Sequence, residues 1–245
     1  MKKKSSFSGQ IGFVLAAAGS AVGVGNLWRF PYLVARDGGG LFLIIYLVLV
    51  LTFGFTLLTT DISIGRKTGQ SAIRAYESMR PGWKKLGFLT FMVPVLIMTY
   101  YAVIGGRILK YFIVFLTGAS GDAAKDSYFT SFITNTSSLW FLVIVMLVTA
   151  LIVYNGVEGG IERCSKFIMP VLLIMVVCIA IFSLTLKSKG ADGVVRTGLD
   201  GLKVYIIPDV SGLTVSRFLQ VTLDAMSQLF FSLSVSMGIM ITYGS

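Results

Sequence analysis

Six long stretches of this chain carry no charged side chain, and they constrain the fold more than any other feature. Each holds 18 to 21 residues, and together they cover residues 11–28, 41–60, 86–106, 137–157, 167–186 and 225–245. A helix needs roughly 20 apolar residues to cross the hydrocarbon core of a bilayer. Backbone groups in lipid must be paired, and the alternating pattern of a lipid-facing barrel is absent, so the stretches predict membrane-spanning helices.

The composition agrees with an all-α membrane protein. Hydrophobic residues make up 55% of the chain and charged residues 13%, about half the charged share of a typical soluble domain. We expect a single membrane domain over residues 1–245. Its predicted helices cover approximately residues 11–35, 41–66, 86–116, 137–155, 167–187 and 216–245.

Six spans place both termini on one side of the membrane. If that side is cytoplasmic, segments 1–10, 61–85 and 158–166 lie inside and carry 11 of the 21 Lys and Arg residues. Segment 61–85 is the most basic connection, and basic loops favour the cytoplasm. The sequence therefore predicts a multi-pass protein of the plasma membrane with a cytoplasmic N-terminus. The net charge of +10 favours anionic lipid headgroups of the bilayer as partner, and not nucleic acid, because the basic residues lie between apolar spans.

The connections between the predicted spans differ in character. Residues 117–136 are rich in small polar residues, which favours a flexible outer loop, and residues 155–166 are expected to form a short cytoplasmic connection. Residues 187–215 are long enough to hold a short surface helix. Asp61 is expected to pair with nearby basic residues, and Asp224 to face an outer vestibule.

Several kinds of chemistry are excluded by what the sequence lacks. The chain has no histidine, and its two cysteines, Cys164 and Cys178, have no metal-ligand spacing. Most metal sites and the Ser-His or Cys-His style of catalysis need such residues. We therefore expect neither an enzyme nor a catalytic residue.

The first apolar stretch contains an unusual run of poor helix formers, AAAGSAVGVGNLWRFPY, at residues 16–32. Its glycines alone would favour close helix packing. The polar side chains of Asn26 and Arg29 cost free energy near lipid unless they line a polar cavity or form hydrogen bonds or ion pairs. Together these residues favour a helix that breaks and exposes its backbone groups to a buried polar site.

The last stretch contains a second such run, QLFFSLSVSMG, at residues 228–238. Serine hydroxyls can bond their own backbone, so a mild bend is the alternative to a break. Two broken helices, the first and the sixth, match the pattern of an inverted repeat, with one repeat over residues 11–187 and a second starting at 216–245. Half-helix N-termini bind anions, and freed carbonyls bind small cations. The site is therefore predicted to hold a cation beside an anionic group such as a carboxylate.

These runs resemble the first- and sixth-helix signatures of the neurotransmitter:sodium symporter family, especially its bacterial amino-acid carriers. The motifs IGRKTG, TYYAVIGG and YNGVEGGIERCSKFIMP extend the resemblance over essentially the whole chain. It implies a leucine-transporter-like inverted-repeat fold with discontinuous helices 1 and 6, and sodium-coupled symport of a neutral amino acid. Sodium ions would be co-transported, and chloride dependence stays open.

The resemblance also implies roles for individual residues. One sodium ion would be held by the carbonyl of Ala21, the side chain of Asn26 and Ser232, and a second by the carbonyls of Gly19 and Val22. The substrate carboxylate would meet the amides of Val24 and Gly25 and the hydroxyl of Tyr101. The substrate side chain would lie among Ile97, Phe231, Ser234 and Met237. On spacing alone, Tyr101 and Met237 would be packing residues and Trp28 an interfacial anchor.

The resemblance also implies an outer and an inner gate, and only the outer one matches the family. Arg29 matches the family's outer-gate arginine, and Gln228 is expected beside it. Lys4 stands where the inner gate has arginine, and lysine does not replace the bidentate guanidinium. Gly23 stands where carriers of monoamines have an aspartate, which favours an amino acid as substrate.

The family's members have eleven or twelve helices, whereas six are predicted here. The chain is therefore expected to be the N-terminal half of a carrier, not competent for transport alone. The alternative is a non-transporting membrane subunit that pairs with a separate C-terminal half or modulates a full-length relative.

Overall fold

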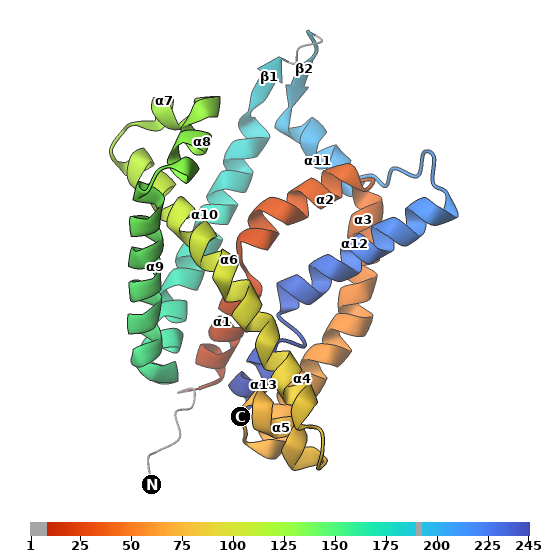
Figure 1. Ribbon diagram of the computed structural model, residues 1–245. Coiled ribbons are helices and arrows are strands. Elements are labelled where there is room, and N and C mark those ends of the chain that lie inside the picture. The colour runs from red at the N-terminus through yellow and green to blue at the C-terminus, as the bar shows by residue number, and fades with distance from the viewer. Residues whose placement is uncertain (1–8, 190–192) are drawn as a thin grey trace.

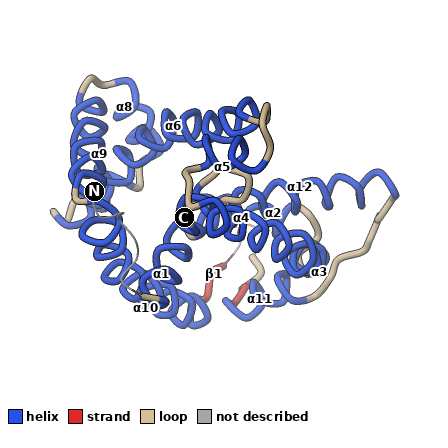
Figure 2. Tube along the Cα trace, turned by 90° about the horizontal axis from the view of Figure 1, so that it is seen from below, coloured by secondary structure: helices blue, strands red, loops and turns tan. Residues whose placement is uncertain are grey.

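The computed structural model describes residues 9–189 and 193–245 of the chain, and Lys4 lies outside them. Most of the described chain is helical, with one small hairpin (Figure 2). The first apolar stretch forms α1 (Gln10–Ala21), a π-helical turn η1 (Gly25–Arg29) and α2 (Phe30–Arg36). The second forms one continuous rod from α3 (Gly40–Leu49) through the π-helical turn η2 (Val50–Gly54) into α4 (Phe55–Thr68).

The following helices complete the first repeat and lead into the second. They are α5 (Ala72–Met79), α6 (Lys84–Leu116), α7 (Ser120–Ala123), α8 (Asp126–Thr134), α9 (Ser137–Tyr154), the π-helical turn η3 (Val157–Glu162) and α10 (Arg163–Thr185). After the hairpin of β1 (Lys187–Lys189) and β2 (Val195–Thr197) come α11 (Gly198–Ile206), α12 (Val215–Leu233) and α13 (Ile239–Gly244). The strands are antiparallel, with Ser188 opposite Arg196.

Within the described residues, four helices are long and apolar enough to cross a membrane, and the bent pair α1 and η1–α2 makes a fifth span. The sixth predicted span is divided into two pieces, α12 and α13, and is not among these five. The four continuous spans leave most of their side chains exposed on the outside of the molecule, with at most 17% of the residues in their apolar segments buried. Apolar exposure on this scale is expected where lipid, and not water, surrounds the helices.

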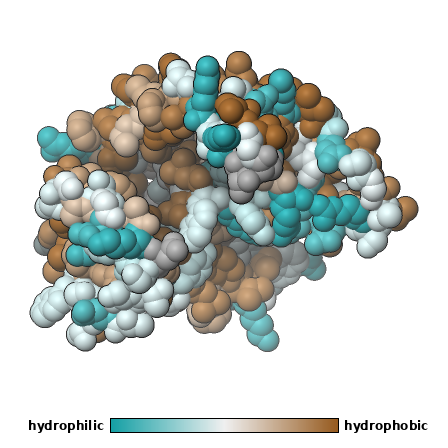
Figure 3. Space-filling view, turned by 90° about the horizontal axis from the view of Figure 1, so that it is seen from above, coloured by the Kyte–Doolittle hydropathy of each residue, from teal (hydrophilic) through white to brown (hydrophobic). Residues whose placement is uncertain are grey.

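The elements are arranged between two ends of the molecule (Figure 1). The start of α1, the helix α5 and the end of α13 lie at one end, whereas the hairpin, α7, α8 and α11 lie at the other. Hydrophobic side chains form much of the rim when the molecule is seen from the hairpin end (Figure 3). This arrangement is that of a multi-pass membrane protein.

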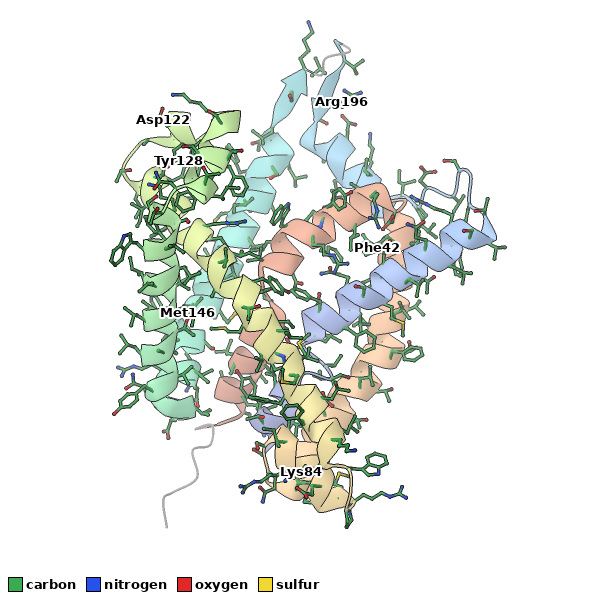
Figure 4. All side chains as sticks on the ribbon, in the orientation of Figure 1. Phe42, Lys84, Asp122, Tyr128, Met146 and Arg196 are labelled. Carbon is green, nitrogen blue, oxygen red and sulfur yellow. The ribbon has the colours of Figure 1, made fainter. Side chains whose placement is uncertain are left out.

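The best-packed part of the core joins the outer half of the first helix to α3 and α12. Its buried side chains are Leu33, Val34, Phe42, Val221 and Ala225, and Figure 4 labels Phe42 between these helices. The ring of Phe30 packs edge-on against Phe42 and Tyr46, with centroids 5.7 and 5.0 Å apart. This packing fixes α2 against α12, and so places the first break beside the second.

Two connections differ from the sequence-based expectation. Residues 117–136 contain α7 and α8, and are not a flexible loop throughout, because the buried Phe132 packs against Phe141 at 5.8 Å between ring centroids. The connection expected over 155–166 shrinks to a turn, since η3 starts at Val157 and continues into α10. Lys166 pairs with the buried Glu162 at 2.6 Å inside this helical segment. The short helix expected within 187–215 is α11.

Helix α11 begins with a capping box that makes its stability pH-dependent. The backbone N–H and the hydroxyl of Thr197 donate to Asp200, at 2.9 and 2.8 Å, and with Lys203 they lower the pKa of Asp200 to about 2. A lowered pKa stabilises the folded state above the ordinary carboxyl pKa of about 3.9, and this contribution disappears as the pH falls through the lowered value.

We therefore predict that protection of the Thr197 amide from hydrogen exchange falls between about pH 4 and pH 2. In Asp200→Asn the protection should be weaker at neutral pH and nearly independent of pH over that range. Hydrogen exchange followed by mass spectrometry on peptides covering β2 and α11 measures it. An identical pH profile in both proteins would contradict the prediction.

Candidate functional site

The first helix is interrupted between Ala21 and Gly25, and its two halves meet at a bend of 57°. The regular hydrogen-bond ladder ends where the N–H of Val22 donates to the carbonyl of Ala18 at 2.8 Å, because Val22 itself has an extended backbone. It resumes where the N–H of Asn26 donates to the carbonyl of Gly23 at 3.0 Å. Backbone groups between these points are released from the ladder.

The sixth helix is interrupted between Leu233 and Ile239. Ser234 and Ser236 have φ values of 50° and 61°, and they are the two non-glycine residues with positive φ in the described chain. Gly238, at φ 72°, precedes α13, and it adopts this conformation without steric cost because it has no Cβ atom. The sequence run of serines therefore marks a true break and not a mild bend.

Hydrogen bonds join the two breaks directly. The hydroxyl of Ser232 donates to Oδ1 of Asn26 at 2.8 Å, and Nδ2 of Asn26 donates to the carbonyl of Ala21 at 2.8 Å. The hydroxyl of Ser234 donates to the carbonyl of Ser20 at 3.0 Å. Segments more than 200 residues apart in sequence thus supply one cluster of oxygen atoms.

Gln228 closes this cluster on the side of α12. Its Nε2 donates to the Ser232 hydroxyl at 3.1 Å and to Asn26 Oδ1 at 3.3 Å. Its Oε1 is buried, and no donor in the described part of the chain reaches it. Arg29 donates to the hydroxyl of Ser227, the residue next to Gln228 in the chain, at 3.2 Å. Gln228 points inward to the break while Arg29 stays at the outer cavity.

Two cavities lie on either side of an aromatic pair. The inner one, of about 210 Å³, and the outer one, of about 510 Å³, are both lined by Tyr101 and Phe231, whose ring centroids are 6.0 Å apart. The inner cavity is also lined by residues of the two breaks, Gly19, Ser20, Ala21, Val22, Gly23, Ser234 and Met237, and by the apolar Pro94, Ile97 and Ile239. The outer cavity is also lined by Val24, Gly25, Trp28, Arg29, Tyr32, Tyr100 and Ile104.

The described residues predicted from the sequence to form the site are thus brought together. All of those assigned to substrate binding line one of the two cavities, and Tyr101 and Phe231 line both. Of the sodium ligands, Ala21, Asn26 and Ser232 form one hydrogen-bonded cluster, while Gly19 and Val22 line the inner cavity. Their individual roles remain predictions.

The donor set is suited to a monovalent cation. No group of three or more His, Cys, Asp and Glu residues that could hold a metal ion occurs among the described residues. The oxygens at the breaks are carbonyl, amide and hydroxyl groups, which are hard and uncharged. Hard cations prefer oxygen ligands, and a ligand set without net charge favours a single positive charge over a divalent ion.

Two contacts at the breaks were not predicted. Ser20 forms hydrogen bonds with Ser234 between the two broken helices. The sequence signal for this contact was its position as the polar residue in the run AAAGSAVG. Asp61 was expected to pair with nearby basic residues, but it forms no ion pair within the described part of the chain. Its buried carboxylate accepts the backbone N–H of Ser236 at 3.0 Å, because α4 packs closely against α13 and turns this side chain toward the break.

Asp61 is therefore expected to hold the second break in shape. We predict that Asp61→Ala leaves the Ser236 N–H without an acceptor and lowers the free energy of unfolding by about 1–3 kcal/mol. Asp61→Asn keeps an acceptor oxygen and should lose less. Thermal unfolding in detergent compares the variants, and equal melting temperatures for the two would contradict this role.

The outer end of the two broken helices carries a cluster of four charges. Arg36 donates through Nε and Nη2 to the buried Asp37, at 2.9 Å each, and also contacts Asp224 of α12. Arg217, also of α12, lies 3.7 Å from Asp37 and donates to the carbonyl of Arg36 at 2.6 Å. Asp224 thus belongs to an ion-pair network that ties α2 to α12.

The fold and the site define a multi-pass membrane protein with two interrupted helices. A sequence model of the sodium:neurotransmitter symporter family matches residues 4–136 and 127–245. The chain therefore belongs to the sodium:neurotransmitter symporter family, whose members are sodium-coupled transporters and not enzymes.

Individual relatives agree with this assignment. A sodium-dependent transporter of Bacillus subtilis is 34% identical over 250 residues, which cover 100% of this chain and 52% of the relative. A sodium- and chloride-dependent taurine transporter of Canis lupus familiaris is 28% identical, with 99% of this chain and 44% of the relative covered.

A solved structure shares the fold. The crystal structure of MhsT in complex with L-phenylalanine superposes with a TM-score of 0.82 at 36% identity and covers 99% of this chain and 54% of that one. The expected leucine-transporter-like fold is thereby confirmed. The chain spans about half the length of the relatives it matches.

Proposed function

We propose that this chain corresponds to the N-terminal half of a sodium-coupled symporter for a neutral amino acid, and that it carries most of the substrate site. One observation carries the proposal: the side chains of Asn26 and Ser232 and the carbonyl of Ala21 meet between the two broken helices. A sodium ion would bind these three oxygens in place of the hydrogen bonds that now connect them.

The amino-acid part of the proposal rests on the cavities beside this cluster. The amides of Val24 and Gly25 would receive the substrate carboxylate together with the Tyr101 hydroxyl, and the ion would neutralise it from the other side. The apolar lining by Ile97, Met237 and other residues supports a neutral, apolar side chain. The likeness to a structure with bound L-phenylalanine supports the same substrate class.

Coupling follows from the shared cavity. An ion and a carboxylate that touch each other each raise the affinity of the other by the same factor. The sodium gradient and the membrane potential then drive uptake, the potential contributing about 2.3 kcal/mol per charge for each 100 mV. A second sodium ion would use the carbonyls of Gly19 and Val22.

The proposal is tested by equilibrium binding of radiolabelled L-phenylalanine and L-leucine to the 245-residue chain in nanodiscs. We expect binding in sodium chloride that disappears in choline chloride. Binding of equal strength in both salts would refute coupling to sodium, and absence of binding in both would refute a substrate site within this chain.

A separate measurement tests transport by the chain alone. We expect no sodium-driven amino-acid accumulation in liposomes that contain only this chain. Accumulation should appear when a C-terminal half from a relative is reconstituted with it. Uptake by the chain alone would refute the part of the proposal that concerns its dependence on a second half.

A further inference from the structure

The turn between α5 and α6 forms an exposed surface of basic and aromatic side chains, which we call the basic corner. It consists of Arg80, Trp83, Lys84 and Lys85, all of them exposed. The guanidinium carbon of Arg80 lies 5.5 Å from the centroid of the Trp83 ring, so the arginine is held over the indole. Figure 4 labels Lys84 at this end of the molecule, opposite the end that carries Arg196.

No acidic side chain among the described residues pairs with the charges of the basic corner, which are those of Arg80, Lys84 and Lys85. Residues 66–85 include six Lys and Arg residues and only one acidic residue, Glu77. At the opposite end, by contrast, Lys125 pairs with Asp122 at 2.6 Å and Lys203 with Asp200 at 3.2 Å.

The basic corner lies where a membrane span begins. Lys84 and Lys85 are the first residues of α6, and the next turn exposes Phe88 and Leu89 by 56% and 62%. Helix α6 is one of the four continuous spans, and these apolar side chains are exposed where it begins. Tryptophan favours the level of the headgroups, directly above the hydrocarbon core. We therefore expect the lysines and Arg80 at the depth of the lipid phosphates.

We propose that the basic corner binds the phosphate of an anionic phospholipid headgroup. The planar guanidinium of Arg80, already oriented by Trp83, can donate two parallel hydrogen bonds to phosphate oxygens. Lys84 and Lys85 add point charges that attract a second negative group or the net charge of the lipid. A zwitterionic lipid offers the same phosphate, but its own cationic group opposes the lysines.

Fluorescence quenching measures this preference at Trp83 itself. The other tryptophans, Trp28 and Trp140, are replaced by phenylalanine, and both are strongly exposed. The protein is reconstituted in phosphatidylcholine vesicles with increasing brominated phosphatidylglycerol or brominated phosphatidylcholine. We expect stronger quenching by the anionic lipid at equal mole fraction, and a preference that decreases about fivefold for each lysine removed. High salt should weaken it, since exposed charges are screened.

The controls use matched lysine pairs at opposite ends of the molecule. Lys84→Gln with Lys85→Gln should abolish most of the preference, whereas Lys187→Gln with Lys189→Gln, on the hairpin, should leave it intact. Quenching by brominated phosphatidylcholine should be unchanged in both, which shows that Trp83 still contacts lipid. Arg80→Gln is a second, independent variant with an expected partial loss.

Equal quenching by the two lipids in the unaltered corner would overturn the proposal. So would a preference that survives both Lys84→Gln with Lys85→Gln and Arg80→Gln. Both leaflets carry the brominated lipid, so the result does not depend on orientation in the membrane. It also needs no sodium or amino acid, and its failure is therefore distinct from failure of the proposed transport function.

Discussion

Replacing Asn26 by alanine is expected to weaken sodium binding by about 100-fold or more. The side-chain amide of Asn26 connects both breaks, since it accepts a hydrogen bond from the Ser232 hydroxyl and donates one to the Ala21 carbonyl. Removal takes away one proposed ligand of the ion and leaves buried partners unsatisfied, at a cost of about 1–3 kcal/mol for each such group. Sodium titration of the melting temperature, or of substrate binding, in nanodiscs measures the loss.

A matched control is available in Asn155→Ala. Asn155 also donates from Nδ2 to a backbone carbonyl, that of Leu151 at 2.7 Å, but it is exposed and far from the breaks in the chain. Its removal should leave sodium affinity within about twofold, because exposed substitutions usually change stability by less than about 0.5 kcal/mol. Sodium affinities that are equal in the two variants would exclude Asn26 as a ligand.

Replacing Gly65 by alanine should cause a large loss of stability. A Cβ atom at Gly65 would lie 2.1 Å from the carbonyl oxygen of Ile241, which belongs to the backbone of α13 and cannot rotate away. The contact is reciprocal, since a Cβ at Gly244 would lie 2.6 Å from the carbonyl oxygen of Ile62. Helix α13 must then move, at a cost of about 1–3 kcal/mol or more, and the melting temperature in detergent should fall.

Gly201→Ala provides the comparison. Gly201 lies within α11, and a Cβ there would meet nothing within 4 Å. Alanine is favoured over glycine inside a helix by roughly 0.5–1 kcal/mol, so this variant should be slightly more stable. The close approach of α4 and α13 would be contradicted if the two alanine variants melted at the same temperature.

The helical spans could be predicted from the sequence because lipid imposes one rule on every residue of a span. Uncharged stretches of sufficient length therefore predicted the continuous spans. The rule does not apply outside the bilayer. There the short helix within 187–215 was predicted correctly, but the flexible loop over 117–136 was not. Residues 117–136 fold into α7 and α8 through aromatic contacts such as Phe132 with Phe141, which no local pattern of small polar residues reveals.

The broken helices could be predicted because glycine, asparagine and serine are unfavourable in a membrane-spanning helix unless they pack closely or serve a polar site. The prediction of which residues meet across the breaks rested on the resemblance to a family. Spacing alone would not have paired Asn26 with Ser232. Asp61 shows what remained hidden. Its partner is a backbone N–H of Ser236, which exists as a free donor only because the helix is interrupted there.

The left-handed serines of the second break have a consequence for how that helix responds to its surroundings. An L-residue in this conformation costs roughly 1–2 kcal/mol, so neither Ser234 nor Ser236 adopts it by local preference. Contacts from elsewhere, Ser20 for one serine and Asp61 for the other, maintain the interruption. The sixth helix is thus bent conditionally, and any event that withdraws either contact releases a segment that tends to straighten.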